Sequence, residues 1–216
     1  MTNPPPGPGS SGSHLHFAPP WSDAPQDRDP LRRARGRLPL PVTVWLAQPA
    51  GSPGTEQFGA AGAPRHEART GSSGASQPGL FQGDRGTVGL TVSSLLVAPG
   101  EPGLLAGVVS PTTDLGDLLA GEGGTSFTVH LLRPGHRRLA QHFAGQLPAP
   151  PEQLAVAVTP AGPALEVVDD RIFCRATGVS SFGWSLLVQA EVLEVELGRP
   201  GPALIWSAGA YHSLGG

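Results

Sequence analysis

The sequence contains no lysine, because all 14 of its basic residues are arginine. This absence excludes mechanisms that need a lysine amine, including a Schiff base, a pyridoxal phosphate site and the Walker A phosphate loop. A single cysteine, Cys174, excludes an internal disulfide and a Cys-x-x-Cys pair for metal or redox chemistry. We expect Cys174, which lies in an apolar run, to be a small buried side chain.

Strong charge and long apolar runs are also missing. The net charge of -3 creates no field that would favour nucleic acid or an anionic membrane as a partner. No apolar run approaches the roughly 18 residues of a membrane-spanning helix, and residues 1–14 lack the pattern of a secretory signal. The seven histidines form no metal-ligand motif. We therefore expect a soluble cytoplasmic protein with no bound metal.

Glycine and proline, 31 and 25 residues respectively, are the abundant residues and are unevenly spread. Residues 1–37 are rich in Pro, Gly and Arg, and have too little apolar surface to offset the entropy of ordering, which predicts a disordered tail. Residues 38–214 form the expected folded domain. Within it, residues 51–85 are mainly Gly, Ala, Pro, Ser and Gln and predict a flexible insertion, which a fold tolerates because loop-closure entropy grows slowly with length.

The folded part shows mainly the pattern of β-strands. Short β-branched or apolar runs predict strands at 41–47, 87–97, 103–109, 126–132, 165–168, 171–177, 184–197 and 203–207. Helical spacing predicts only two short helices, at 114–119 and at 136–144, the second ended by Gly145. Many short strands with few helices favour an all-β barrel over alternating βαβ units.

Hydroxyl side chains gather in two segments next to expected strands. The first holds Thr91, Ser93 and Ser94, and the second, at the start of a helix, holds Ser110, Thr112 and Thr113. A helix start with hydroxyls suits a phosphate group, because free N–H groups and the helix dipole point at it. The alternative is a simple helix cap, which the carboxylate of Asp114 favours because it would repel a phosphate.

The ordered set of segments resembles the flavin reductase-like, FMN-binding split-barrel family. The segments are the apolar strand 42–47, Gly-Leu-Thr-Val-Ser-Ser at 89–94, the apolar strand 104–109 with Ser-Pro-Thr-Thr at 110–113, the helix 136–145, and the closing segment 203–214. The resemblance implies a split β-barrel with short helical insertions, a homodimer, and FMN or FAD bound near the subunit interface.

The resemblance also implies an activity and a set of binding residues. Thr91, Ser93 and Ser94 would line the isoalloxazine and ribityl part of the flavin, and Ser110, Thr112 and Thr113 would meet its phosphate. The activity implied is NAD(P)H-dependent reduction of flavin, which in some members supplies reduced flavin to a partner monooxygenase. The flavin carries the organic chemistry, and the protein positions it.

One family motif is replaced in this chain. Many members carry Gly-Asp-His before a long strand near the end, whereas here Gly183 is followed by Trp184 and Ser185. Two alternatives therefore stand beside the reductase: a non-catalytic split-barrel protein that holds flavin or haem, and a structural homologue without a ligand. The colour of the purified protein and its oxidation of NADH or NADPH distinguish the three, and no catalytic residue is assigned.

Overall fold

The computed structural model describes residues 30–49, 81–82, 86–121, 124–147 and 154–215. The chain divides into two units, Met1–Arg37 and Leu38–Gly216. In the first unit, α1 (Pro30–Arg37) is helical where the sequence predicts a disordered tail. Proline is favoured at the first helical position, and the following Leu, Ala and Arg residues have high helix propensity, which accounts for the difference. The remainder of the expected tail, and residues 51–80 and 83–85 of the expected insertion, lie outside the described residues. Phe81–Gln82, also expected in the flexible insertion, form a short strand instead because they pair with the edge of β4 (Val88–Val92).

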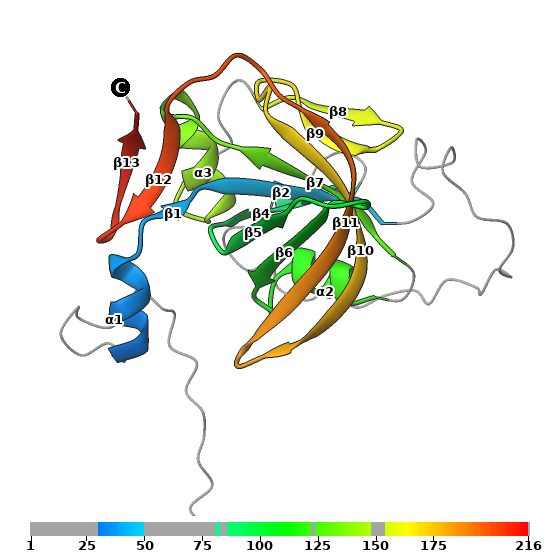
Figure 1. Ribbon diagram of the computed structural model, residues 1–216, viewed down its shortest axis with the longest axis horizontal. Coiled ribbons are helices and arrows are strands. Elements are labelled where there is room, and N and C mark those ends of the chain that lie inside the picture. Colours follow the sequence, from blue (N-terminus) through cyan, green and yellow to red (C-terminus); the bar gives the residue numbers. More distant parts are fainter. Residues whose placement is uncertain (1–29, 50–80, 83–85, 122–123, 148–153, 216) are drawn as a thin grey trace, which may run out of the picture. The chain divides into compact units, whose positions relative to one another are not determined.

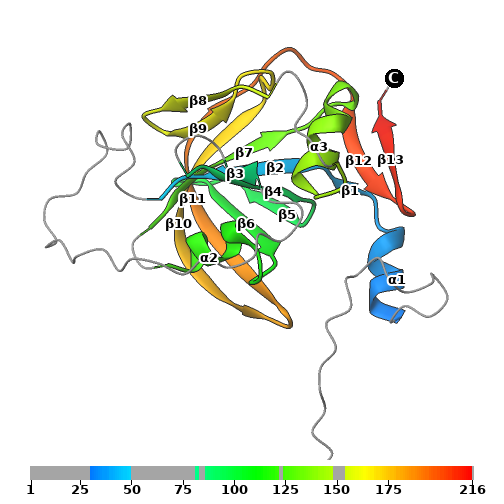
Figure 2. The ribbon, with the colours of Figure 1, turned by 180° about the vertical axis from the view of Figure 1, so that it is seen from behind.

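The second unit is mainly β and is built around one curled sheet of eight strands (Figure 1). Its strands, in spatial order, are β3 (Phe81–Gln82), β4 (Val88–Val92), β2 (Thr43–Ala47), β7 (Ser126–Leu131), β10 (Arg171–Phe182), β11 (Ser185–Glu196), β6 (Leu104–Val109) and β5 (Leu95–Ala98). All of their pairings are antiparallel. The long β10–β11 hairpin extends past the other strands, as both Figure 1 and Figure 2 show.

The sheet curls into a split barrel because one chain segment contributes strands near both of its ends. The sequence predicts a single strand over 87–97, but the structure bends this segment at Ser93 and Ser94 into β4 and β5. β4 pairs with β2, whereas β5 pairs with β6 at the far end of the sheet. The N–H of Val108 donates to the carbonyl of Ser94 at 3.1 Å, directly at the bend. The expected split β-barrel is thereby confirmed.

The central strand β2 separates two hydrophobic cores, because all five of its residues are buried. Trp45 and Ala47 point into the barrel, where the Trp45 ring stacks on Phe127 with centroids 5.0 Å apart. Val44 and Leu46 point outward into a second core beneath β9 (Gly162–Leu165), β12 (Ala203–Ser207) and α3 (Arg137–Phe143). Burial on both faces explains why β2 reads as a continuous apolar run rather than as an alternating one.

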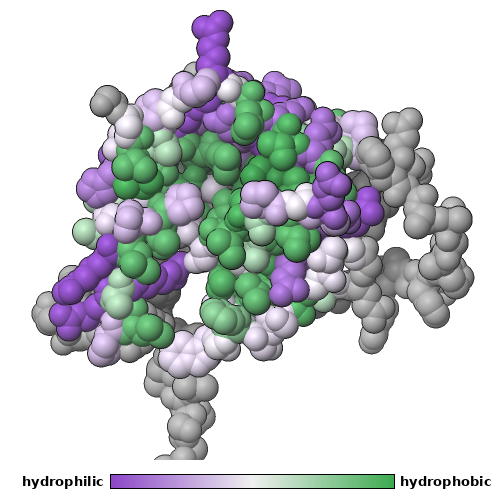
Figure 3. All heavy atoms as spheres, viewed as in Figure 1, coloured by the Kyte–Doolittle hydropathy of each residue, from purple (hydrophilic) through white to green (hydrophobic). Residues whose placement is uncertain are grey.

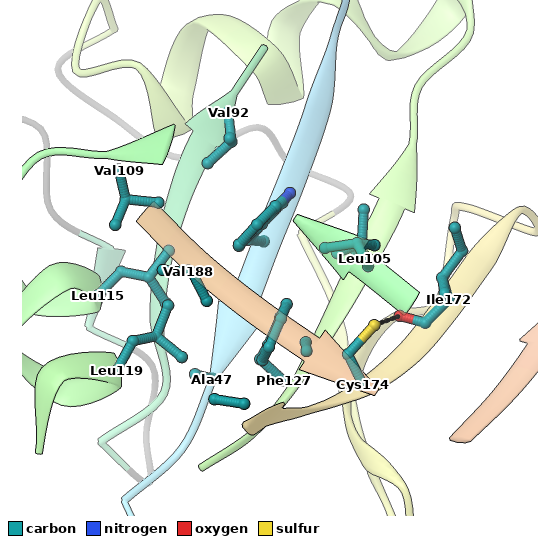
Figure 4. Close-up of a cluster of buried hydrophobic side chains, with 14 of the residues drawn as sticks. Ala47, Val92, Leu105, Val109, Leu115, Leu119, Phe127, Ile172, Cys174 and Val188 are labelled. Carbon is teal, nitrogen blue, oxygen red and sulfur yellow. Dashed lines mark hydrogen bonds between the residues drawn. The ribbon is translucent and has the colours of Figure 1, made fainter. Parts of the chain in front are cut away.

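The two short helices of this unit each cover one of the cores. α2 (Asp114–Ala120) turns Leu115 and Leu119 into the barrel interior near Val109 (Figure 4), and α3 buries Leu139 and Phe143 in the outer core. A single 3₁₀ turn over Pro134–His136 leads into α3. None of the helices in the described part of the chain is long and apolar enough to cross a membrane.

Two smaller sheets complete the unit. β1 (Leu40–Pro41), β12 and β13 (Ala210–Leu214) form one, and β8 (Val156–Thr159) and β9 form the other. The sequence predicts a strand over 165–168, but the strand ends at Leu165 because Glu166 and Val167 form an exposed turn. β9 is fixed to the large sheet by His130.

His130 is a buried link between three strands. Its Nδ1 lies 3.0 Å from the carbonyl of Val44, and its Nε2 accepts the backbone N–H of Leu165 at 2.9 Å. Because Nε2 accepts, Nδ1 carries the proton and donates it to Val44. Desolvation by burial lowers the pKa of His130 to about 4, so the imidazole stays neutral near pH 7 and serves as a structural group.

Gly107 provides a direct test of how the barrel closes. A Cβ there would lie 2.5 Å from the Trp45 ring and 2.9 Å from the Ser94 carbonyl oxygen, so Gly107→Ala forces the indole or the bend to move. We expect this change to lower the free energy of unfolding by about 1–3 kcal/mol, measured by chemical denaturation. The control is Gly178→Ala in the same sheet, where the added Cβ meets only the end of the Gln189 side chain at 3.4 Å. Equal stability of the two variants would contradict the account of the closure.

Candidate functional site

The structure brings the two hydroxyl segments together at one end of the barrel. The bond from the Val108 N–H to the Ser94 carbonyl places Ser93 and Ser94 beside the end of β6. Ser110 follows that strand by one residue and opens the second segment. The segments are 16 residues or more apart in the sequence, and the bend between β4 and β5 is what makes them neighbours.

The turn that follows β6 is held by Thr113, which is the N-cap of α2. Its hydroxyl donates to the carbonyl of Ser110 at 2.8 Å and accepts the N–H of Gly116 at 3.1 Å. Gly116 permits this close packing, since a Cβ at that position would lie 2.2 Å from the Ser110 carbonyl oxygen. The Thr113 hydroxyl is therefore a helix cap, as the alternative interpretation predicts. Its proton and one of its lone pairs both take part in hydrogen bonds within the turn.

Ser110 and Thr112 present their hydroxyls differently. The two oxygens lie 3.0 Å apart, and the Ser110 Oγ also accepts the N–H of Thr112 at 3.3 Å. Both contacts lie in exposed surroundings, in contrast to the bonds of Thr113. A hydroxyl pair of this kind can donate to an oxygen of a ligand while the backbone turn stays unchanged.

Thr91 is placed apart from the other five residues. Its side chain lies on the outer face of β4, and its hydroxyl donates to the carbonyl of Ala140 in α3 at 2.7 Å. This contact ties α3 to the barrel wall. The structure thus gathers Ser93, Ser94, Ser110, Thr112 and Thr113 at one end of the barrel, whereas Thr91 makes a contact with the outer core.

The described groups with shifted pKa values do not belong to the two hydroxyl segments, whereas the carboxylates of Asp114 and Asp117 lie in the first turn of α2, next to Thr113. Desolvation lowers the pKa of His136 and of His142, and burial raises the pKa of the Cys174 thiol to about 12, so this thiol is not a nucleophile. Within the described ranges, no group of three or more His, Cys, Asp or Glu side chains could hold a metal ion. Hydroxyls, backbone groups and the two carboxylates of the first turn of α2 are the polar groups next to the site.

Two aromatic residues lie at the same end of the barrel, and no sequence motif predicts their position. The β10–β11 hairpin ends in a two-residue turn, Gly183–Trp184, with Phe182 and Ser185 as the closing pair. The side chains of Phe182 and Trp184 are 59% and 76% exposed. The sequence singles out this turn only because the family's Gly-Asp-His is replaced there. The strand register, in which Leu186 pairs with Val109, shows that the turn lies at the end of the barrel that also holds Ser110.

Comparison with known proteins shows the family to which the chain belongs. The family model described as "Flavin reductase like domain" matches residues 35–215. The chain belongs to the flavin reductase-like domain family. It is 35% identical over 126 residues, or 58% of its length, to the reductase component of 4-hydroxyphenylacetate 3-monooxygenase from Thermus thermophilus, 78% of which is covered. The predicted family and the predicted class, a flavin reductase-type oxidoreductase, are both confirmed.

Solved structures of flavin reductases share the fold. The flavin reductase PheA2 superposes with a TM-score of 0.64 at 17% identity, covering 88% of this chain and all of that one. The styrene monooxygenase flavin reductase of Pseudomonas putida gives 0.60 at 18% identity, with 85% and 96% covered. An NADH:FAD oxidoreductase of Streptomyces globisporus, in complex with NAD and FAD fragments, gives 0.61 at 18% identity, with 88% and 93% covered.

Substitution of the two threonines in the turn after β6 distinguishes a helix cap from a contact with the ligand. Thr113→Ala removes the cap, and we expect it to lower the free energy of unfolding by about 1 kcal/mol. Thr112→Ala should leave stability nearly unchanged and weaken flavin binding about tenfold, if its exposed hydroxyl donates to a charged oxygen. Denaturation and flavin fluorescence titration measure the two effects.

Thr177→Ala, at another exposed threonine, is the matched control for Thr112→Ala. It should alter neither quantity. Flavin affinity that stays unchanged in Thr112→Ala and in Thr113→Ala, with stability lowered in the latter, would reduce this turn to a structural cap and reject its assignment to the flavin phosphate.

Proposed function

We propose that the chain is the reductase component of a two-component flavin-dependent monooxygenase, reducing free flavin with NAD(P)H and releasing it to a separate oxygenase. The observation that carries this proposal is the 35% identity to a protein named as such a component, within a family match that spans residues 35–215. The proposed compartment is the cytoplasm, where dihydronicotinamide is available as the reductant.

The hydroxyl groups at this end of the barrel suit the ribityl and phosphate part of a flavin, because they can form hydrogen bonds with it. Ser110 and Thr112 offer exposed hydroxyls, and the bend at Ser93 and Ser94 lies beside them. Asp114 in the first turn of α2 disfavours a free charged phosphate directly at the helix start. In our proposal the hydroxyls therefore contact the ribityl chain and the first phosphate from the side, a portion that FMN and FAD share.

The chain's own residues bind and orient in this scheme. Thr113 and Gly116 hold the turn so that the hydroxyl pair of Ser110 and Thr112 keeps one geometry. Leu118 of α2 and Leu186 of β11, both half-buried against the barrel core, offer apolar surface to a flat ring. When bound, flavin supplies a two-electron acceptor for hydride, and preorganised contacts of this kind lower the entropic cost of the encounter.

The fully buried histidine of the described residues offers no ligand for a haem iron. His130, the fully buried histidine, uses both ring nitrogens for Val44 and Leu165, so neither is available to an iron. The non-catalytic alternative that the comparisons favour is a flavin carrier, and turnover separates it from a reductase.

A turnover experiment tests the proposed function. Under anaerobic conditions, one equivalent of the full chain should reduce many equivalents of added FMN or FAD with NADH or NADPH, because reduced flavin leaves the site. Absorbance of flavin and of dihydronicotinamide follows the reaction. Reduction that stops after one equivalent of flavin per chain would contradict release, flavin binding without reduction would indicate a carrier, and no flavin binding would reject the function altogether.

The proposal includes a homodimer, supported by the outer sheet face (Leu96, Leu104, Val108, Phe182 and Leu187). By strand alternation these side chains lie on the side of β5, β6, β10 and β11 opposite the barrel core. Figure 3 shows apolar side chains gathered over this region, where Leu96 and Leu104 are 68% and 50% exposed. Contiguous apolar surface on a soluble protein marks an interface, and a second copy is the proposed partner.

Light scattering tests the dimer. We expect about twice the chain mass of 22.1 kDa at micromolar concentration, and Leu104→Glu should shift the protein to the monomer because it buries a charge in the contact. Asp117→Glu, an exposed change on α2 that adds no charge, serves as the control. A monomeric wild-type chain would contradict this part of the proposal.

A further inference from the structure

The barrel end that holds the hydroxyl segments is built from parts of the chain that contain no basic residue. Residues 86–121, which include the Ser93–Ser94 bend, the turn after β6 and α2, contain no Lys, Arg or His. Residues 176–190, which include the turn of the β10–β11 hairpin, contain no charged residue and no histidine. Protein sites that hold a doubly charged phosphate commonly supply arginine or lysine for it. These segments supply neither.

Two carboxylates lie at this end instead. Asp114 and Asp117 occupy the first turn of α2, directly after the cap residue Thr113. Because the two residues are three positions apart, their side chains lie on the same side of the helix. Asp117 is exposed and Asp114 is half-buried. They place two negative charges beside the turn that carries the exposed hydroxyl pair.

No described side chain forms an ion pair with these carboxylates. The acidic partners in the ion pairs of the described residues are Asp170 and Glu196, and neither belongs to α2. Arg175 lies near the opposite end of the helix. Its side chain is 3.8 Å from the position that a Cβ on Gly124 would occupy, and Gly124 lies beyond the C-terminal end of α2. The negative potential at the start of α2 is therefore not balanced by a described arginine.

The carboxylates also have a structural effect, which is separate from their effect on a ligand. Acidic residues in a first helical turn stabilise the helix, because its N-terminus carries partial positive charge. This stabilisation lowers the positive potential that an anion near the helix start would experience. A phosphate next to Ser110 and Thr112 meets both carboxylates whether or not they stabilise α2.

We propose that Asp114 and Asp117 make the chain selective for FAD over FMN, an inference that rests on the proposed function. The phosphate of FMN is a monoester, and such a group carries a charge of about −1.5 to −2 at pH 7. In FAD the same phosphate is part of a diphosphate and carries a single negative charge, while the other charge lies farther along the molecule. Repulsion by the two carboxylates is therefore stronger for FMN. Riboflavin, which has no phosphate, experiences none.

The size of the effect follows from the number of charges rather than from any new contact. In water, two unit charges about 8 Å apart change a dissociation constant about twofold. Because Coulomb energies add, a dianion experiences about the square of the factor that a monoanion experiences. Reduction of the flavin ring leaves the phosphate charge unchanged, so the same preference holds for the flavin that enters and for the reduced flavin that leaves.

The test is fluorescence titration of the full chain with FMN, FAD and riboflavin. Asp114→Asn should tighten FMN binding about fourfold and FAD binding about twofold, and should leave riboflavin binding unchanged. Asp117→Asn should act in the same direction. Asp114→Glu keeps the charge and should bind all three flavins as the wild type does. At 1 M salt, where the Debye length falls to about 3 Å, the gain in Asp114→Asn should largely disappear.

Glu194→Gln is the matched control, because it also removes one negative charge but at the opposite end of β11. Glu194 lies eight positions from Leu186, which pairs with Val109 at the site end, or roughly 25 Å along an extended strand. This variant should alter the affinity for none of the flavins. If the role of Asp114 were limited to helix stability, Asp114→Asn would lower the melting temperature slightly without tightening FMN binding.

The outcomes separate this inference from the proposed function. Equal changes for all three flavins in Asp114→Asn, no change, or weaker binding of FMN would overturn the inference. Steady-state kinetics of the wild type should give a higher kcat/KM for FAD than for FMN, and the reverse order would overturn the inference while the function stands. If the wild type reduces no flavin, the turnover experiment has already rejected the function on which the inference rests.

Discussion

The close approach of the Trp45 indole to Gly107 is the constraint on which the rest of the structure depends. The indole stacks on Phe127 inside the barrel and leaves no room for a side chain on the facing strand β6. Because Gly107 has none, β6 can lie close enough for the N–H of Val108 to reach the carbonyl of Ser94. That contact closes the sheet and joins two chain segments that carry the site's hydroxyls.

Function follows from what this closure brings to one end of the barrel. The Ser93–Ser94 bend, the capped turn at Ser110–Thr113 and the Gly183–Trp184 turn come from three separate parts of the sequence, and strand pairing alone makes them neighbours. The end has hydroxyls, apolar surface and an exposed indole, and the carboxylates of Asp114 and Asp117 lie in the first turn of α2. Such a site can hold flat, polar-tailed molecules and let them go, which is what a protein that releases reduced flavin requires.

Local patterns in the sequence predict much of this fold. Most of the apolar run at 42–47 is indeed a buried strand, Thr43–Ala47, and Thr113 caps a helix that begins at Asp114. Other features of the fold depend on contacts with residues that are distant in the sequence. The bend at Ser93 depends on Gly107, the strand expected at 171–177 extends to Phe182 because β11 lies beside it, and the hydroxyl of Thr91 bonds to α3. The prediction of a flavin ligand came from the family resemblance, because composition and periodicity alone do not indicate a particular ligand.

The most direct measurement of the central claim is a crystal structure of the full chain grown with FMN or FAD. The account predicts the ribityl chain within hydrogen-bond distance of Ser110 or Thr112, and the ring against the barrel end between the Ser93–Ser94 bend and the Gly183–Trp184 turn. Flavin bound instead on the outer core, beside α3 and β12, would contradict the account, because the barrel closure would then have no part in forming the site.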